Sequence, residues 1–302
     1  MAGPLPASLL PDTATLSHDD VTIGGVSLRD LAATYGTPLF VYDETTLRSR
    51  CREAASVFDD GVAFASKSFL CGAMARLAFE EGLCIDVSTG GELDIVLRSG
   101  VPASRVILHG NNKSHDELER ALSVGVHRVI VDNFHEIERL GALVSPTSPL
   151  NCLVRVTPGV EAHTHEFVRT GQEDTKFGFS VATGDARRAI SQLQELPGMS
   201  VRGVHAHIGS QIFDLAGYRE TIDILADFTK DDAFDELCVG GGLGVAYVEG
   251  ESAPSIHEWG SALRKAASEA GLDPSLRLLA EPGRAIVAQA GLTLYRVGAV
   301  KP

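Results

Sequence analysis

The chain has 302 residues, of which 44% are hydrophobic and 22% are charged, and its formal net charge is −14. A chain of this length and composition can bury a large core, which excludes a disordered or fibrous protein and favours one large α/β domain with additional segments. The acidic balance and the lack of any run of Lys and Arg disfavour nucleic acid and anionic membrane surfaces as partners.

The first residues and the cysteines indicate the compartment. Residues 1–17 contain neither a basic segment nor a long apolar stretch, so we expect no signal peptide. No apolar run reaches the roughly 18 residues that a membrane span needs. The five cysteines form no Cys-x-x-Cys pair, and Cys84, Cys152 and Cys238 fall in apolar runs where a thiol acts as a small hydrophobe. These features favour a reducing, cytoplasmic location.

The N-terminal residues predict a small unit of their own. Strands are expected at 21–28 and 38–42, on either side of a helix at 28–35. This part stands outside the alternation that follows, and we interpret residues 1–43 as a segment that contributes to a β domain.

Eight short apolar runs then alternate with stretches of helical spacing. Eight strand–helix units over about 240 residues are typical of a TIM-type (β/α)8 barrel, although a doubly wound sheet shows the same alternation. We therefore predict an α/β fold with a barrel at 44–285. The strand-rich residues 286–302 are expected to begin a second β domain, of which both chain ends carry remnants. The runs are 61–66, 84–87, 105–109, 127–132, 151–157, 201–207, 235–239 and 277–280, and the clearest helices are expected at 73–81, 91–98, 116–124 and 185–196.

Polar or glycine-rich motifs follow nearly every apolar run. Barrel enzymes build their sites on the loops after the strands, so these motifs are expected to meet at one mouth of the barrel. They are Lys67, Ser88–Glu92, Asn111–Lys113, Thr157–Gly159, His207–Gln211, Gly240–Gly244 and Glu281–Arg284.

Lys67 ends the first run, in the segment FASKSFL. A lysine walled by apolar residues loses hydration, which favours the neutral amine, and a neutral amine can form a Schiff base with an aldehyde. The alternative is a lysine whose ammonium simply reaches solvent at the end of a strand.

The glycines at 240–244 predict a phosphate site. Backbone N–H groups without side chains form a nest for anions, and the loops after strands seven and eight are a recurrent phosphate site in barrels. Gly283 and the backbone of Arg284 follow run eight, and Ser210 follows run six, so both lie where they could complete that site.

Glu281 and His207 suit a pyridine ring. A carboxylate at a strand end can pair with a protonated pyridine nitrogen, which makes the ring an electron sink, and an imidazole can lie flat on the ring. The alternative for Glu281 is an ordinary salt bridge with Arg284.

His205 and His207 support a rival interpretation. Two residues apart on a strand, they face the same way and could bind a divalent metal, as in a metal-dependent barrel hydrolase. That hydrolase requires further His or Asp ligands at other strand ends, whereas run eight ends in Glu-Pro-Gly-Arg and run one in lysine. A second pair, His163 and His165, falls outside any strand run and is interpreted as a polar loop, so we predict no metal site.

These segments together resemble the fold-type III pyridoxal-phosphate decarboxylases, and among them the diaminopimelate decarboxylase branch more than the ornithine or arginine branch. The resemblance covers nearly the whole chain, in the family's order. It rests on TPLFVYDE (37–44), FASKSFL (64–70), DVSTGGEL (86–93), HGNNKS (109–114), VTPGVEAHTHEF (156–167) with KFGFS (176–180), GVHAHIGSQI (203–212), GGGLG (240–244) and EPGR (281–284).

The resemblance implies a role for each matching residue. Lys67 would hold pyridoxal 5'-phosphate as a Schiff base, His207 would stack on the ring, and Glu281 would pair with the pyridine nitrogen. Asp86 and Arg155 would surround the lysine and the ring, and Arg284 would also bind a substrate carboxylate. The phosphate would be held by Ser210, Gly240, Gly241, Gly242, Pro282, Gly283 and Arg284.

The implied reaction is decarboxylation of meso-2,6-diaminopimelate to L-lysine in an enzyme that is a homodimer when its C-terminal domain is present. In this family that domain carries a cysteine acid and residues that read the far end of the substrate. Only its first strands are expected within 286–302, so the resemblance implies that the isolated chain decarboxylates poorly, and a barrel that binds the cofactor without turnover remains an alternative.

Overall fold

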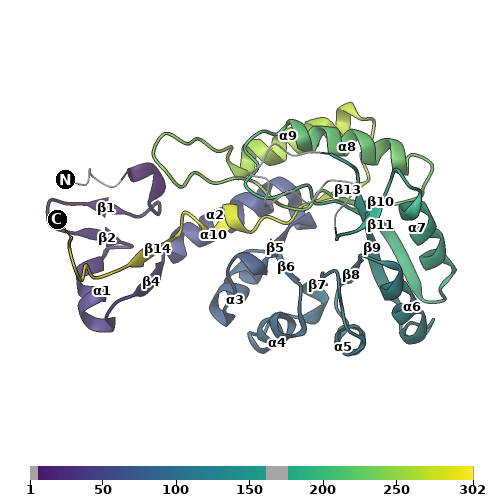
Figure 1. Ribbon diagram of the computed structural model, residues 1–302, viewed down its shortest axis with the longest axis horizontal. Helices are drawn as coiled ribbons and strands as arrows, with labels where there is room; N and C mark the ends of the chain where they lie inside the picture. The colour runs from purple at the N-terminus through teal and green to yellow at the C-terminus, as the bar shows by residue number, and fades with distance from the viewer. Residues whose placement is uncertain (1–5, 161–175, 302) are drawn as a thin grey trace.

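The computed structural model describes residues 6–160 and 176–301, and eight parallel strands form its central sheet (Figure 1). The sheet closes because Val62 bridges Ala280 in parallel, with Ala63 N–H donating to Ala280 O at 2.9 Å. The predicted (β/α)8 barrel is therefore confirmed, and the doubly wound sheet is excluded. The strands, in spatial order, are β13 (Arg277–Leu279), β12 (Glu236–Cys238), β11 (Met199–His205), β9 (Leu150–Thr157), β8 (Arg128–Val131), β7 (Val106–Leu108), β6 (Cys84–Val87) and β5 (Ala63–Ala65), with the short β10 (Phe179–Ser180) paired to β9.

Helices cover the outside of the barrel (Figure 1). Several begin at side-chain caps that the sequence supplies. Ser114 and Ser255 each form a capping box with the glutamate three residues on, which satisfies backbone N–H groups at the start of α5 and α9. The helices are α2 (Glu44–Phe58), α3 (Gly72–Glu80), α4 (Gly90–Arg98), α5 (His115–Val124), α6 (Phe134–Leu143), α7 (Asp185–Glu195), α8 (Ala216–Thr229), α9 (Ile256–Glu269) and α10 (Arg284–Val287).

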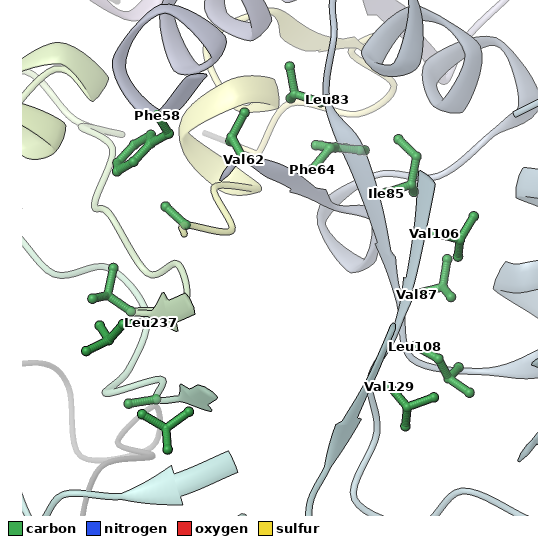
Figure 2. Packing of buried hydrophobic residues seen from close by; sticks show 14 of the residues in the cluster. Phe58, Val62, Phe64, Leu83, Ile85, Val87, Val106, Leu108, Val129 and Leu237 are labelled. Carbon is green, nitrogen blue, oxygen red and sulfur yellow. The ribbon is translucent and has the colours of Figure 1, made fainter. Parts of the chain in front are cut away.

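The core has two layers because successive strand residues point to opposite faces. On β5, Phe64 joins the large cluster between strands and helices, part of which Figure 2 shows. Its neighbour Ala63 points into the barrel instead. The small interior cluster consists of Ala63, Cys84, Ile107, Ile130, Leu153, Cys238 and Leu279. All five cysteines are free thiols.

The ends of the chain pair with each other beside the barrel. Strand β14 (Gly291–Leu294) runs antiparallel to β4 (Leu39–Tyr42), and both lie with the N-terminal elements on the side away from most of the barrel (Figure 1). These N-terminal elements are β1 (Thr15–Leu16), β2 (Val21–Ile23), β3 (Val26–Ser27) and α1 (Leu28–Tyr35).

Two local expectations differ from the structure. The strand expected at 21–28 is a hairpin, because Gly24 and Gly25 have φ values of 58° and 79° and turn the chain between β2 and β3. The strand-rich stretch expected from 286 begins with the end of helix α10, where Ile286 and Val287 are buried. Packing of these two side chains outweighs their β propensity. No helix in the described part of the chain is long and apolar enough to cross a membrane.

Candidate active site

A cavity of about 540 Å³ opens at the carboxyl ends of the strands. The residues that line it come from loops after strands far apart in the sequence, as the sequence predicts. They include Lys67, Ser68, His207, Ser210, Gly242, Tyr247, Glu281, Gly283 and Arg284, with Phe40, Tyr42 and Leu292 from the paired chain ends.

Lys67 lies in a short 3-10 helix, Ser66–Ser68, directly after β5. Its side chain is 57% exposed, so the apolar enclosure expected around it is wrong: the chain turns outward after Ala65 and carries the amine into the open cavity. Its Nζ lies 3.9 Å from Oδ2 of Asp86. The lysine thus faces solvent on one side and a carboxyl group on the other.

Asp86 is buried on β6, beneath Lys67. Neither of its carboxyl oxygens has a hydrogen-bond partner among the described residues, although His109 Nε2 lies 3.8 Å from Oδ1. Burial raises the pKa of the Asp86 carboxyl, against the pull of His109 and Lys67. A buried polar group without partners is costly, and such groups concentrate at functional sites.

Glu281 follows β13 and is held between two buried imidazoles. His109 Nε2 lies 2.9 Å from Oε1, and His205 Nε2 lies 2.9 Å from Oε2. Burial opposes ionisation, yet the two histidines hold the pKa of the Glu281 carboxyl well below its usual range. Burial also lowers the pKa of His205 to about 4, so this cluster pairs a carboxylate with a neutral imidazole. The alternative of a salt bridge to Arg284 is not what the structure shows, because Arg284 donates to Tyr247 Oη at 2.8 Å.

His207 and His205 have different partners, although the sequence suggested one shared metal site. His207 lies just after β11, and its Nδ1 accepts the Gly241 N–H at 3.2 Å. This hydrogen bond leaves the ring proton of the neutral form on Nε2. Burial and the nearby Lys67 lower the pKa of His207 well below its usual range.

His205 lies close to a different pair of residues than the sequence suggested. Ligand atoms of His109, His205 and Glu281 lie within 4.8 Å of one another. The hydrogen bond of Glu281 with His205 and its 2.9 Å contact with His109 account for this arrangement without a metal ion. His163 and His165 lie outside the described residues.

Glycines form the wall of the cavity next to Glu281. Gly242 has a φ of 103°, and a Cβ there would lie 2.3 Å from Gly209 O. A Cβ on Gly241 would lie 2.1 Å from Glu281 O. Gly240 precedes them with a φ of 69°, so this wall tolerates no side chain and brings backbone to the cavity.

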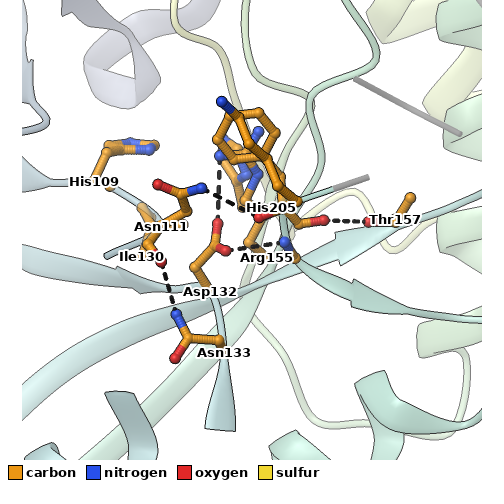
Figure 3. Close-up of polar contacts among 12 residues, drawn as sticks. His109, Asn111, Ile130, Asp132, Asn133, Arg155, Thr157 and His205 are labelled. Carbon is orange, nitrogen blue, oxygen red and sulfur yellow. Dashed lines mark hydrogen bonds and ion pairs between the residues drawn. The ribbon is translucent and has the colours of Figure 1, made fainter. Parts of the chain in front are cut away.

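Arg155 lies at the end of β9 in a polar network (Figure 3). Asp132 connects Arg155 with Gly178: its Oδ2 lies 3.5 Å from the Arg155 guanidinium, and its Oδ1 accepts the Gly178 N–H at 3.1 Å. The guanidinium also lies over the Phe177 ring, 4.4 Å from its centre. Arg155 therefore holds residues 177–178 against the barrel mouth rather than lining the cavity itself.

The residues predicted from sequence thus fall into two groups. Lys67, His207, Ser210, Gly242, Glu281, Gly283 and Arg284 line the cavity. The others surround the cavity; they are Asp86, Arg155, Gly240, Gly241 and Pro282. The carbonyl oxygen of Pro282 accepts the Ala65 N–H at 3.1 Å, which continues the closure of the barrel.

Three residues with contacts at the site were given no role from sequence: His109, Asp132 and Tyr247. His109 and Asp132 each end an apolar run, so the positional rule that singled out Lys67 could have found them. Tyr247 lies in a loop after β12, and its sequence position carries no comparable signal.

The fold and the cavity define a class of protein that comparison establishes independently. The family model of the pyridoxal-dependent decarboxylases, pyridoxal binding domain, matches residues 44–288. The chain belongs to this family, which confirms the expected pyridoxal cofactor, and the matching family gives no support to a metal-dependent hydrolase.

Within the family, the chain groups with the diaminopimelate decarboxylases. It is 45% identical over 298 residues to that of Mycobacterium tuberculosis, covering 93% of this chain and 66% of the relative. It is 43% identical over 303 residues to that of Bacillus subtilis, covering 94% and 68%. The crystal structure of the M. jannaschii diaminopimelate decarboxylase with L-lysine has a TM-score of 0.87 at 29% identity, covering 96% of this chain and 71% of that one. The chain therefore spans about two thirds of the length of these relatives.

The residues present fit pyridoxal phosphate. The cavity combines an exposed amine, an ionised buried carboxylate and a glycine wall that only bare backbone can occupy. The unpartnered Asp86 oxygens beneath the amine show that this part of the site is arranged for a group beyond the chain's own contacts.

Proposed function

We propose that this chain holds pyridoxal 5'-phosphate on Lys67 and is the cofactor-binding part of an enzyme that decarboxylates meso-2,6-diaminopimelate to L-lysine and CO2. One observation carries the proposal: the amine of Lys67 and the ionised carboxylate of Glu281 share one cavity with a glycine wall. Diaminopimelate decarboxylases at 40–45% identity support the substrate.

Each residue has a distinct part in this proposal. Pyridoxal phosphate, when bound, supplies a conjugated electron sink for the bond that breaks at the substrate's α-carbon. Lys67 attaches the cofactor, and the Asp86 carboxyl, 3.9 Å from its Nζ, lies beneath the point of attachment. Glu281 pairs with the pyridine nitrogen, and His207, whose Nδ1 accepts the Gly241 N–H, packs on the ring.

The glycine wall of the cavity suits anions. Ser210, Gly242 and Gly283 line it together, and they would receive the phosphate through hydroxyl and backbone N–H groups, with Gly240, Gly241 and Pro282 shaping the turn behind them. Arg284, oriented by Tyr247, is the cation available for a substrate carboxylate.

We also propose the wider organisation. Residues 1–43 and 286–302 contribute to a β domain beside the barrel at 44–285, which the pairing of β14 with β4 supports. The protein is proposed to be cytoplasmic and, as a whole enzyme, a homodimer that binds neither nucleic acid nor membrane. An ornithine or arginine type of decarboxylase is the alternative, and a lysine/ornithine decarboxylase from Vibrio vulnificus, 26% identical with a TM-score of 0.74, keeps it open.

Covalent trapping tests the cofactor site directly. The purified chain with pyridoxal phosphate should turn yellow, and borohydride should fix the cofactor on the peptide that contains Lys67. Lys67→Ala should abolish the label, whereas Lys230→Ala, at an exposed lysine that pairs with Asp227 three residues before it, should keep it. A colourless chain, or a label that survives Lys67→Ala at another site, would show the proposal wrong.

The substrate is tested by CO2 release. With the cofactor bound, meso-diaminopimelate should compete with cofactor attachment and release CO2 faster than ornithine or arginine. Faster turnover of ornithine or arginine would favour the alternative branch. Binding of the cofactor with no CO2 release from any of the three would favour a barrel that binds without turnover.

A further inference from the structure

Glu281 is a buried carboxylate whose charge is balanced in an unusual way. Its side chain is 6% exposed, and within the described residues its ion-pair partners are His109 and His205 rather than a lysine or arginine. Each carboxylate oxygen faces one Nε2 at 2.9 Å. An isolated buried carboxylate would take up a proton, so these two contacts decide its ionisation.

A second carboxyl group in the same space supports this reading. Asp86 lies beside the cluster, and its oxygens are 3.8 Å from His109 and 3.9 Å from Lys67, without a hydrogen bond. Both acids are buried, with exposures of 1% for Asp86 and 6% for Glu281, yet only Glu281 has an imidazole nitrogen 2.9 Å from each oxygen. The two carboxyl groups therefore differ in their contacts with the histidines rather than in being buried.

We propose that His109 and His205 are positioning residues that act through Glu281: each holds its Nε2 at 2.9 Å from one carboxylate oxygen and together they keep the carboxylate ionised, so that the cofactor's pyridine nitrogen carries the proton. This inference rests on the proposed function and adds two residues to it. If either donor is lost, Glu281 takes the proton, and a neutral acid donates to the pyridine nitrogen instead of accepting from it. The ring then remains unprotonated and is a weaker electron sink.

The arrangement also explains two sequence motifs. His109 begins HGNNKS after β7, and His205 ends β11 at the start of HAHIGS, so three separate strand ends meet at one carboxylate. The two rings pack edge to face with centres 5.1 Å apart, which fixes both. His205 therefore serves Glu281, while His207, two residues on, serves the cavity.

The first experiment needs no cofactor. Both contacts use Nε2, whose position the amide of glutamine reproduces and the shorter asparagine does not reach. Difference infrared spectra of the cofactor-free 302-residue chain near neutral pH, with a chelator present, should show a new protonated-carboxyl band in His109→Asn and in His205→Asn. The Gln variants should lack it, and adding Glu281→Gln to an Asn variant should remove it. If the Asn variants fail to fold, Glu281→Asp withdraws the carboxylate from both histidines and should show the band.

The second experiment reads the cofactor. With ring-¹⁵N pyridoxal phosphate bound, the wild-type nitrogen should have the chemical shift of a pyridinium, and the Gln variants should keep it. Each Asn variant should move the shift towards that of an unprotonated pyridine and weaken cofactor binding about tenfold, because a hydrogen bond to a charged group is lost.

The outcomes separate the two proposals. No carboxyl band in any Asn variant or in Glu281→Asp, or a pyridinium shift retained in both Asn variants, would overturn the role of the histidines. A wild-type chain that shows the expected infrared differences but takes up no pyridoxal phosphate would overturn the proposed function and leave the histidine contacts established.

Discussion

Buried histidines give this protein an acid-sensitive stability. Burial lowers the pKa of His205 to about 4, and burial with Arg128 and Arg277 nearby lowers that of His127 to about 4 as well. In the unfolded chain both titrate near pH 6.5. Between these values the unfolded state binds more protons than the folded state, so the free energy of unfolding falls as the pH falls.

The predicted slope can be assigned to one residue. Urea unfolding at about pH 7 and about pH 5 should show a lower free energy of unfolding at the lower pH. His127→Gln should make this difference smaller, by no more than the contribution of the single proton that His127 binds. His127 is preferable to His205 because it lies at the opposite end of the barrel from the site, at the start of β8. Equal pH dependence in the variant and the wild type would contradict the lowered pKa of His127.

Lys113 shows a second use of buried charge. Its side chain is 1% exposed, and its Nζ donates to Glu136 Oε1 at 2.7 Å, Gly110 O at 2.7 Å and Ile130 O at 2.6 Å. Glu136 in turn accepts the Asp132 N–H at 3.0 Å. The ion pair thus fixes the loop after β7 and positions Asp132 for Arg155.

Removing one member of this pair should be costly. Lys113→Met should lower the free energy of unfolding by about 3–5 kcal/mol, because Glu136 is left buried without its cation. Lys113→Met with Glu136→Gln should recover much of the loss in urea titrations. Lys230→Met, which breaks an exposed pair with Asp227, should cost far less, because solvent screens that pair. A similar cost at both lysines would show that burial does not decide the effect.

At the residue scale, the sequence predicts which residues lie at the site better than it predicts how exposed they are and which residues they contact. The end of an apolar run was sufficient to single out Lys67 and Glu281. It could not show that Lys67 is exposed, because exposure depends on how the chain turns after β5. The partners of Glu281 were also out of reach, since His109 and His205 lie 172 and 76 positions away and meet it only when the barrel closes.

At the scale of elements, the strands were the most predictable part. All eight runs overlap barrel strands, and the helices expected at 73–81, 91–98, 116–124 and 185–196 match α3, α4, α5 and α7 within a residue at each end. Burial on both faces makes barrel strands continuous apolar runs, which stand out in sequence. Within 286–300 the expected strand appears as β14, and the difference lies at Ile286 and Val287, which end helix α10. Four residues of helix leave too little periodicity to outweigh β-branched composition.

Helix α9 packs on α2 through a glycine. A Cβ on Gly260 would lie 1.9 Å from Val57 Cγ1, so the helices approach as closely as they do only because no side chain intervenes. Gly260→Ala should lower the free energy of unfolding by about 1–3 kcal/mol, since overpacking exceeds the gain of about 1 kcal/mol in helix propensity.

A paired variant tests this cause. Val57→Ala removes the group in conflict, so Gly260→Ala should cost less in that background than in the wild type, as measured by urea unfolding. Ser261→Ala, at the exposed neighbour on α9, reports the effect of propensity without the contact. Stabilisation by Gly260→Ala in the wild-type background would show that the helices separate without cost.

At the scale of the molecule, the two ends of the barrel differ in kind. At the amino ends of the strands, Arg128 and Arg277 both pair with buried Glu236, each with one contact of 3.0 Å to Oε1, so the buried carboxylate is balanced by charges of the chain itself. At the carboxyl ends, Asp86 lacks partners and the cavity opens. Stability and chemistry are thus separated to opposite ends, as is general for barrels.

The paired chain ends carry an exposed apolar surface, formed by Phe40, Tyr295, Val297 and Val300. Figure 1 shows these ends beside the barrel. Phe40 is 70% exposed on β4, and Tyr295, Val297 and Val300 beyond β14 are 74%, 78% and 82% exposed. The sheet that carries this surface has only two strands, so each strand also presents an unpaired edge. Exposed apolar groups of this kind favour association with another surface.

We therefore expect the 302-residue chain to self-associate as its concentration rises. In sedimentation velocity, Tyr295→Ser with Val297→Ser should shift the chain towards the monomer, because the substitutions remove apolar area from that surface and neither residue lines the cavity. Ile95→Ser, at an exposed apolar residue on α4 of the barrel, should leave association unchanged. Association that is equally strong in the double variant would place the contact elsewhere on the molecule, and a chain that stays monomeric at every concentration would show that this surface does not drive assembly by itself.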